Sequence, residues 1–398
     1  MRQAPSQYGS RASQYVRQKG PPVSDTIESF LASSLDETPY LVVDLEVVTT
    51  KYAELQRALP GVSIHYAVKA NPLPDILSTL RRAGSSFDIA SPVELDLCLA
   101  TGVDPAQLSF GNTVKKASAI RYAHAAGVTL FSVDCVSELE KVAENAPGAR
   151  VMARLRTMSR GAEWPLSRKF GCDEEPALDL LIGATRLGLV PYGVSFHVGS
   201  QQTDPSQWSD PIARAARLYS RLRKQGVELQ CLNIGGGFPA QYIEVLPAIE
   251  EYGRAVQRSL RCHFGTRGPR IMAEPGRFLV AEAGVIQSEV VLVSRRSKAD
   301  GPRWVYLDCG RFGGLAETMN EAIKYPLRTH HATDSNSPVV LAGPTCDSAD
   351  ILYERTMYSL PDDLRAGDRV QILSAGAYTH MYASVGFNGF PPLKATCV

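Results

Sequence analysis

The chain has 398 residues, with 42 basic and 41 acidic side chains and a formal net charge of +1 at pH 7. Because the two signs are balanced and interspersed, no field favours nucleic acid or an anionic membrane surface, and no apolar run is long enough to span a bilayer. None of the eight cysteines forms a C-x-x-C pair or has the usual zinc-ligand spacing with histidines. We therefore expect reduced thiols, no bound metal and a cytoplasmic protein.

Residues 1–37 are predicted to be a flexible N-terminal leader. The first twenty residues are rich in Arg, Ser and Gln and contain no acidic residue, which is typical of disordered segments. An organelle transit peptide has a similar composition and is the alternative interpretation.

From about residue 60 to residue 276, short β-rich runs alternate with amphipathic stretches of helical length, as in βα units around a parallel sheet. Eight candidate strands occupy residues 63–68, 86–90, 107–110, 128–133, 149–155, 191–198, 228–234 and 269–274. Eight such units predict an α/β fold with a (β/α)8 barrel, assigned to residues 46–280. Further β-rich runs without regular helical crossovers follow, so residues 281–398, together with residues 38–45, are assigned to a second, β domain.

The carboxyl ends of barrel strands form the active site in proteins of this fold. In this chain nearly every strand closes on a polar or glycine residue: Lys69, Asp88, Asn112, Asp134, Arg154, His197, the run Gly235 to Gly237, and Glu274. Each alone is accounted for as a solvated turn residue. A lysine, a histidine, arginines and several acids on one rim exceed what solvation requires, so this rim is the candidate active site.

Glycines after the seventh and eighth predicted strands indicate a phosphate site, because backbone N–H groups there can approach an anion closely. The two segments are NIGGGFP, residues 233–239, and EPGR, residues 274–277. A lysine able to form a Schiff base, a phosphate site and a carboxylate between them suggest pyridoxal 5'-phosphate. Glu274 would keep the pyridine nitrogen protonated, and His197 would lie against the ring face.

These motifs resemble those of the fold-type III, alanine-racemase-like decarboxylases of basic amino acids, and within them the bacterial ornithine/lysine decarboxylases of the ornithine decarboxylase family. The similarity runs from about Thr38 to the C-terminus, through YAVKAN, FDIAS, WPLSRKFG, SFHVGSQ, NIGGGFP, AEPGR, AGPTCDSAD and FNGF. It implies Lys69 as the Schiff-base lysine, His197 as the ring-stacking residue and Glu274 as the pyridinium partner, with Asp88 and Arg154 beside the cofactor. The implied phosphate contacts are Ser200, Gly235, Gly236, Gly237, Gly276, Arg277 and Tyr378.

Cys346 and Asp347 decide the reaction type within this family. Taken alone, they would be a buried structural cysteine and a turn acid. The resemblance implies instead a homodimer with shared active sites, in which both residues reach into the partner's site. Cys346 would protonate the substrate Cα after carbon dioxide leaves, and Asp347 would bind the distal ammonium. Glu321 is a second candidate for the ammonium, at a place where eukaryotic ornithine decarboxylases have a tyrosine–aspartate pair and this chain has Asn320 and Glu321.

The expected reaction is decarboxylation of L-ornithine, L-lysine or both to putrescine and cadaverine, in polyamine biosynthesis. The two substrates differ by one methylene, which is worth only about 1–3 kcal/mol in discrimination. Alternatives on the same scaffold are an amino-acid racemase or a decarboxylase of diaminopimelate, arginine or a D-diamino acid. A non-catalytic regulatory homologue is the alternative from another class; such proteins usually lose cofactor residues, and this chain retains them.

Overall fold

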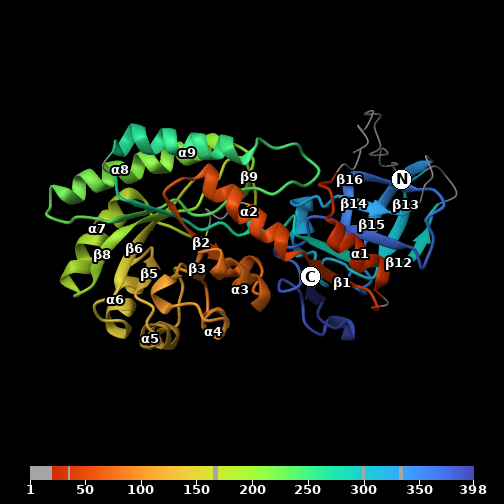
Figure 1. The fold of residues 1–398 in the computed structure, drawn as a ribbon, viewed down its shortest axis with the longest axis horizontal. Helices are drawn as coiled ribbons and strands as arrows, with labels where there is room; N and C mark the ends of the chain where they lie inside the picture. Colours follow the sequence, from red (N-terminus) through yellow and green to blue (C-terminus); the bar gives the residue numbers. More distant parts are fainter. Residues whose placement is uncertain (1–19, 35, 165–168, 267, 298–300, 331–334) are drawn as a thin grey trace, which may run out of the picture.

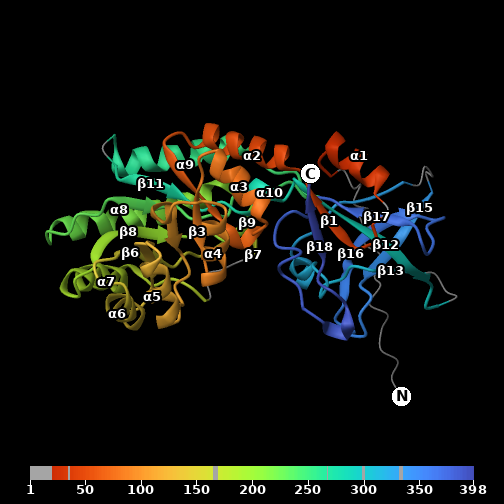
Figure 2. The same cartoon turned by 60° about the horizontal axis from the view of Figure 1, so that its bottom comes forward.

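The computed structural model describes residues 20–34, 36–164, 169–266, 268–297, 301–330 and 335–398. It contains a closed barrel of eight parallel strands and a separate, mostly β domain, which lie side by side (Figures 1 and 2). The predicted fold class is thereby confirmed. No helix in the described part of the chain is both long and apolar enough to cross a membrane.

All eight predicted barrel strands form, although most are shorter than expected. Around the barrel they are β2 (Val62–Ala67), β3 (Ser86–Ile89), β4 (Leu108–Phe110), β5 (Leu130–Val133), β6 (Arg150–Leu155), β8 (Val190–Phe196), β10 (Cys231–Asn233) and β11 (Arg270–Ala273), and β11 pairs with β2 to close the ring. Every pairing is parallel, so the carboxyl ends of all eight strands meet at one rim. This rim carries the candidate active site.

The outer layer consists of helices that connect successive strands. They are α2 (Leu45–Ala58), α3 (Pro74–Arg82), α4 (Pro92–Ala100), α5 (Ala117–Ala125), α6 (Val136–Asn145), α7 (Glu174–Arg186), α8 (Ser209–Arg223), α9 (Ile249–Phe264) and the short α10 (Arg277–Val280). Their beginnings follow local chemistry. In α4, Ser91 accepts the N–H of Glu94 at 3.2 Å and Glu94 accepts the N–H of Ala90 at 2.7 Å, which is a capping box.

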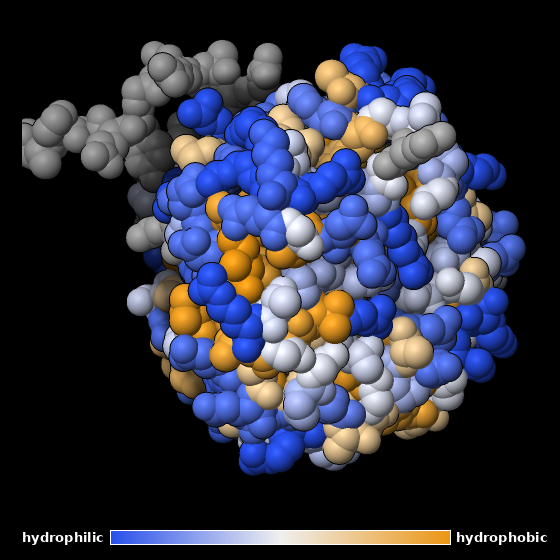
Figure 3. Space-filling model, turned by 90° about the vertical axis from the view of Figure 1, so that its left-hand side faces the viewer, coloured by the Kyte–Doolittle hydropathy of each residue, from blue (hydrophilic) through white to orange (hydrophobic). Residues whose placement is uncertain are grey.

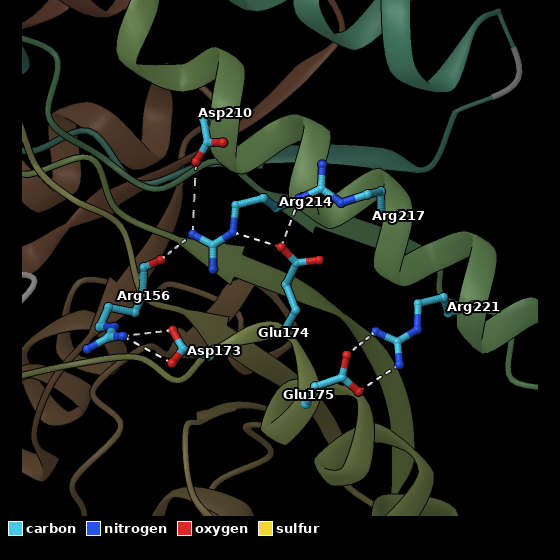
Figure 4. A network of polar contacts seen from close by, with 8 residues as sticks. All are labelled: Arg156, Asp173, Glu174, Glu175, Asp210, Arg214, Arg217 and Arg221. Carbon is cyan, nitrogen blue, oxygen red and sulfur yellow. Dashed lines mark hydrogen bonds and ion pairs between the residues drawn. The ribbon is translucent and has the colours of Figure 1, made fainter.

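Ion pairs join helices α7 and α8 to the segment that follows β6 (Figure 4). Arg214 donates from Nε to Glu174 at 3.0 Å and from Nη1 to the carbonyl oxygen of Arg156 at 2.7 Å. Arg221 pairs with both oxygens of Glu175 at 2.6 and 2.7 Å. Exposed ion pairs contribute only about 0.2–1 kcal/mol each to the free energy of unfolding. The main effect of this network is therefore to hold the chain just after Arg154 in place. The end of the barrel away from the β domain is largely hydrophilic, with apolar side chains scattered over it (Figure 3).

The β domain is built on an eight-stranded sheet. Its main path is β14 (Leu327–Thr329), β17 (Arg369–Ile372), β12 (Gly284–Ser294), β13 (Arg303–Leu307), β15 (Asn336–Ala342) and β16 (Ile351–Pro361). β1 (Tyr40–Val43) pairs with β12 on one side and with β18 (Lys394–Cys397) on the other. The strand that precedes the barrel in the chain therefore belongs to this sheet, and the barrel lies between two parts of it in sequence.

Part of the predicted leader is helical, in contrast to the expectation of flexibility. Helix α1 (Asp25–Ser33) is capped by Ser24, whose hydroxyl accepts the N–H of Ile27 at 3.3 Å. Ile27, Phe30 and Leu31 have the i, i+3, i+4 spacing of an amphipathic helix and pack with Tyr40 of β1. The composition of the first twenty residues therefore does not describe residues 25–33. Residues 1–19 lie outside the described residues.

Candidate active site

Lys69 lies on a 3₁₀ turn, η1 (Val68–Ala70), directly after β2. Its Nζ is 3.4 Å from Oδ2 of Asp88, which is buried near the end of the neighbouring strand β3, and its side chain is 41% exposed at the rim. Burial lowers the pKa of Lys69, but the negative charge of Asp88, with smaller contributions from Tyr378 and Glu274, raises it above its usual value. Asp88 is held in turn by the hydroxyl of Ser109 at 3.0 Å. The sequence prediction that places a cationic amine at the barrel mouth agrees with this geometry.

Glu274 follows β11, and its carboxyl group interacts electrostatically with the amine of Lys69. Burial, followed by the charge of Asp88, raises the pKa of Glu274 to about 7, whereas Lys69, Asn233 and Arg154 favour the ionised form. Asn233 Nδ2 donates to Glu274 Oε1 at 2.5 Å. The carboxyl group therefore titrates near neutral pH and has one fixed hydrogen-bond donor.

The glycine run after β10 is folded tightly against two neighbouring strand ends. Gly235 and Gly237 have φ angles of 68° and 105°, and a Cβ atom on either would overlap backbone atoms of Phe196 or Gly199. The N–H of Gly235 donates to Asn233 Oδ1 at 2.9 Å, and its carbonyl oxygen accepts the N–H of Glu274 at 2.9 Å. Glycine is therefore required at both positions.

His197 lies beside this loop, just after β8. Its Nδ1 accepts the N–H of Gly199 at 3.0 Å, and its carbonyl oxygen accepts the hydroxyl of Thr157 at 2.6 Å. Its Nε2 is 3.1 Å from the position that a Cβ atom on Gly236 would take. Burial, followed by the charges of Arg154 and Lys69, holds the pKa of His197 well below its usual value. The imidazole is thus neutral and presents an uncharged planar face.

Three further predicted residues lie at the same rim with different functions. Arg154 lies over the ring of Phe170 at 4.9 Å. Asp134 accepts the N–H of Gly171 at 2.9 Å and so fixes the segment that carries Phe170. Asn112 accepts the N–H of Val114 at 3.1 Å. Asp134 and Asn112 therefore shape loops, whereas Arg154 remains at the site.

Arg277 is engaged more completely than the sequence indicated. Its five N–H groups donate to the Ser200 hydroxyl at 3.3 and 3.0 Å, to the Tyr242 hydroxyl at 2.8 Å, and to both oxygens of Glu317 at 2.8 and 2.7 Å. A guanidinium has five donors, so Arg277 can contact a phosphate only by exchanging one of these partners. The ring of Tyr378 lies 4.9 Å from the guanidinium carbon, and the Tyr378 hydroxyl is 3.1 Å from the Cβ position of Gly276. Of the predicted phosphate contacts, Ser200, Gly276 and Tyr378 thus lie around Arg277.

Glu317 and Asn233 are two site residues that the sequence analysis did not single out. Glu317 has only 3% of its surface exposed and forms a buried ion pair with Arg277. No local pattern marks it, because its partner lies forty positions earlier in another domain. Asn233 stands two residues before Gly235, which is the spacing of an Asx turn and was a usable signal.

Glu321 has a structural position that does not suit its predicted contact with the substrate. Its Oε1 accepts the N–H groups of Glu354 and Arg355 at 2.9 and 2.7 Å, and its Oε2 accepts the N–H and hydroxyl of Thr356, both at 2.8 Å. These bonds keep the pKa of Glu321 below its usual value even though burial acts in the opposite direction. The carboxylate is thus hydrogen-bonded to strand β16, and its contact with a substrate ammonium stays a prediction.

We expect replacement Glu321→Gln to lower the free energy of unfolding by about 1–3 kcal/mol, because a carboxamide cannot accept all four bonds. We expect the KM for L-lysine to stay unchanged. Denaturant unfolding and steady-state kinetics measure the two effects. The matched variant is Asp347→Asn, for which we expect a raised KM and unchanged stability. If Glu321→Gln raised KM without a loss of stability, Glu321 would bind the substrate after all.

Cys346 and Asp347 lie on the exposed loop between β15 and β16. The Cys346 N–H donates to Asn388 Oδ1 at 3.0 Å, and Asp347 Oδ1 accepts the N–H of Ala349 at 2.8 Å. The buried carboxylate of Asp350 accepts the N–H of Arg311 at 2.7 Å and the hydroxyl of Thr345 at 2.7 Å, which fixes the loop. Among the hydrogen bonds and ion pairs of the described residues, none joins Cys346 or Asp347 to the barrel.

The residues at the rim suit pyridoxal 5'-phosphate. A lysine amine, a carboxyl group that titrates near pH 7, a neutral imidazole and a glycine loop that a Cβ atom would obstruct are the groups that this cofactor needs for attachment, ring protonation, stacking and phosphate binding.

Comparisons with known proteins agree with this geometry. Residues 45–281 match the family model described as the pyridoxal binding domain of pyridoxal-dependent decarboxylases. A lysine/ornithine decarboxylase of Selenomonas ruminantium is 34% identical over 358 residues, which span 89% of this chain and 88% of that protein. The structure of a lysine/ornithine decarboxylase from Vibrio vulnificus complexed with cadaverine has a TM-score of 0.84 at 32% identity and covers 95% of this chain and 100% of its own.

A third similar structure is an arginine decarboxylase from Paramecium bursaria Chlorella virus bound to agmatine, with a TM-score of 0.86 at 27% identity, covering 94% of this chain and 99% of that chain. The family match extends over more than half of the chain, and the rim residues have the chemistry that the family's cofactor requires. The chain therefore belongs to the pyridoxal-dependent decarboxylases and is a carboxy-lyase that uses pyridoxal 5'-phosphate.

Proposed function

We propose that this protein decarboxylates L-ornithine and L-lysine to putrescine and cadaverine, as a step of polyamine biosynthesis. The observation that carries the proposal is the meeting of Lys69, Glu274 and the glycine loop at one rim, in a chain that is 34% identical to a lysine/ornithine decarboxylase. The complex of the Vibrio vulnificus enzyme with cadaverine supports the same substrate class.

The cofactor, when bound, supplies an electron sink for the electron pair that remains on Cα when carbon dioxide leaves. The side chains of the chain do the rest. Lys69 holds the cofactor covalently between turnovers, and neutral His197 covers one face of the site and excludes water from it. Glu274 would pair with the ring nitrogen of the bound cofactor. Cys346 delivers a proton to Cα, and Asp347 binds the distal ammonium of the substrate.

The active sites are proposed to be shared across a homodimer. Cys346 is exposed, and Asp347 follows it on the same loop of the β domain, where its carboxylate accepts the N–H of Ala349 from that loop. Large apolar side chains are also exposed in this domain, which favours a protein interface: Met319, Met381, Tyr382, Val385, Phe387 and Phe390. All eight cysteines are free, which supports the proposed location in the reducing cytoplasm.

The substrate is proposed to carry a distal amine rather than a distal carboxylate. Asp347 supplies the negative charge in this proposal, whereas the Glu321 carboxylate is hydrogen-bonded to strand β16. A single acidic residue that binds the distal ammonium of a flexible substrate side chain discriminates weakly between substrates that differ by one methylene. We therefore expect both ornithine and lysine to react.

A carbon dioxide release assay tests the proposal. The panel is L-ornithine, L-lysine, L-arginine, meso-diaminopimelate and the D-isomers, and we expect release from L-ornithine and L-lysine. Asp347→Asn is expected to raise KM for both substrates, because the distal ammonium loses its partner. Release from meso-diaminopimelate or a D-isomer alone would reject the proposed substrates. No release from any compound by a protein that has bound the cofactor would favour the non-catalytic alternative.

Arginine decarboxylation is the second candidate, because the agmatine-bound viral enzyme has a TM-score of 0.86 with this chain. A guanidinium is larger than an ammonium and prefers a bidentate carboxylate. The same panel separates the two: a kcat/KM for L-arginine above that for L-lysine would make arginine the substrate.

A further inference from the structure

Asn233, the last residue of β10, lies completely buried between Glu274 and the glycine loop. Its Oδ1 accepts the N–H of Gly235 at 2.9 Å, and its Nδ2 donates to Glu274 Oε1 at 2.5 Å. One side chain thus connects the glycine loop after the seventh strand with the carboxyl group after the eighth.

The carboxamide has a defined polarity in this position. An amide oxygen only accepts and an amide nitrogen only donates, so the N–H of Gly235 fixes Oδ1 and thereby directs Nδ2 at Glu274. A donor at 2.5 Å favours the carboxylate form of Glu274, because the protonated oxygen of a carboxylic acid would itself need an acceptor.

Few other groups counteract the effects that favour protonation of Glu274. Burial and the charge of Asp88 on β3 raise the pKa of Glu274 to about 7, and Lys69 on η1 and Arg154 on β6 act in the other direction. Cys231 on β10 is also within electrostatic range, and His197 after β8 is neutral. Among these neighbours, Asn233 is the one whose hydrogen bond lowers the pKa of Glu274.

We propose that Asn233 is a positioning residue that keeps Glu274 ionised and correctly oriented, and that couples this carboxylate to the phosphate-binding glycine loop. The inference rests on the proposed cofactor contacts of Glu274 and Gly235. The inference also explains why residue 233 is an asparagine, because only its amide nitrogen can donate to Glu274. An aspartate would still accept the N–H of Gly235, but it would place a second carboxylate against Glu274. The two carboxyl groups would then retain one proton between them.

The test uses protein freed of pyridoxal 5'-phosphate. Infrared spectra recorded from about pH 5 to pH 9 follow the carbonyl stretch of protonated carboxyl groups, and the band that Glu274→Gln removes belongs to Glu274. The wild-type band is expected to titrate near pH 7. In Asn233→Asp the titration is expected to shift upward by more than about one pH unit, because two close carboxylates cannot both ionise readily.

Two further variants separate the donor from the space that it fills. The double variant Asn233→Asp with Glu274→Gln restores one N–H···O bond of reversed polarity, so thermal stability is expected to return toward wild type. Asn233→Ala removes both bonds and is expected to weaken binding of pyridoxal 5'-phosphate more than that of pyridoxal, which lacks the phosphate. Asn71→Asp is the matched control, because Asn71 is also fully buried and its side chain bonds two backbone groups, the carbonyl oxygen of Gly376 at 2.8 Å and the N–H of Leu73 at 3.2 Å. The titration of Glu274 in this variant is expected to match wild type.

An Asn233→Asp protein whose Glu274 titrates at the wild-type pH would overturn the proposal, and so would a double variant no more stable than Asn233→Asp. If Asn233→Asp failed to fold while the double variant folded, the repulsion between the carboxylates would be supported directly. None of these measurements needs a substrate. A shifted titration in a protein that releases no carbon dioxide would therefore leave this inference intact and reject the proposed function alone.

Discussion

Replacement of Lys69 by alanine is expected to abolish both the absorbance of the bound cofactor and decarboxylation. The amine can bond covalently to the cofactor aldehyde, and it lies at the barrel mouth 3.4 Å from Asp88. We expect turnover to fall by at least roughly 10⁴-fold, the upper end of the range for one positioned proton-transfer group. Visible absorbance and carbon dioxide release are the two measurements.

A lysine elsewhere in the chain gives the matched control. Lys51 on α2 pairs with Glu282 at 2.7 Å and with Glu54 at 3.4 Å, outside the rim. The variant Lys51→Ala is expected to keep the cofactor absorbance and turnover. If Lys69→Ala retained full activity, or if Lys51→Ala also lost the cofactor, Lys69 would not be the attachment site.

Replacement of Cys346 by alanine is expected to change the product more than the release of carbon dioxide. Bond cleavage relies on the rim of the barrel, whereas the proton for Cα comes from the cysteine in the proposed reaction. Diamine formation is therefore expected to fall by about 10²–10⁴-fold, and other products are expected to rise relative to diamine. The ratio of diamine to carbon dioxide is the measurement. A ratio equal to that of wild type would remove Cys346 from the mechanism.

Mixing two proteins that each fail to form diamine tests whether Cys346 acts across a subunit boundary, with diamine formation as the measured activity. Lys69→Ala and Cys346→Ala affect different subunits of one shared site. Dimers that re-form at random from an equal mixture should contain one intact site in each mixed dimer and recover about a quarter of the wild-type activity. Recovery is absent if each subunit supplies its own cysteine. Cys135→Ala, at another exposed cysteine, serves as the partner in the control mixture.

The parts of the site that could be predicted from sequence are those that a single strand and its following turn determine. Lys69 and His197 each follow a β-rich run, and the run Gly235 to Gly237 occurs where a barrel places its phosphate loop. Eight alternating units determine the rim to which all of these belong. The resemblance to a family then assigned roles that no periodicity contains, above all those of Cys346 and Asp347.

The parts that could not be predicted depend on pairings between distant segments. Glu317 carries no local signal, and its effect on Arg277 exists only because the β domain folds against the barrel. The sequence shows that a carboxylate occurs at Glu321, but it does not show that three N–H groups and a hydroxyl of β16 hydrogen-bond to that carboxylate. Helix α1 could not be predicted from composition either, because its apolar residues pack against β1 and not against their neighbours in sequence.

Strand β1 limits how the gene can be divided. Its four residues are all buried and pair with β12 and β18, partners that the chain reaches only after the whole barrel. A fragment of residues 20–281 would leave Tyr40–Val43 without either neighbour, as an apolar edge prone to pair with other molecules. A barrel expressed from residue 45 onward lacks that edge strand. The N-terminal boundary for expressing the barrel without the β domain therefore lies between Val43 and Leu45.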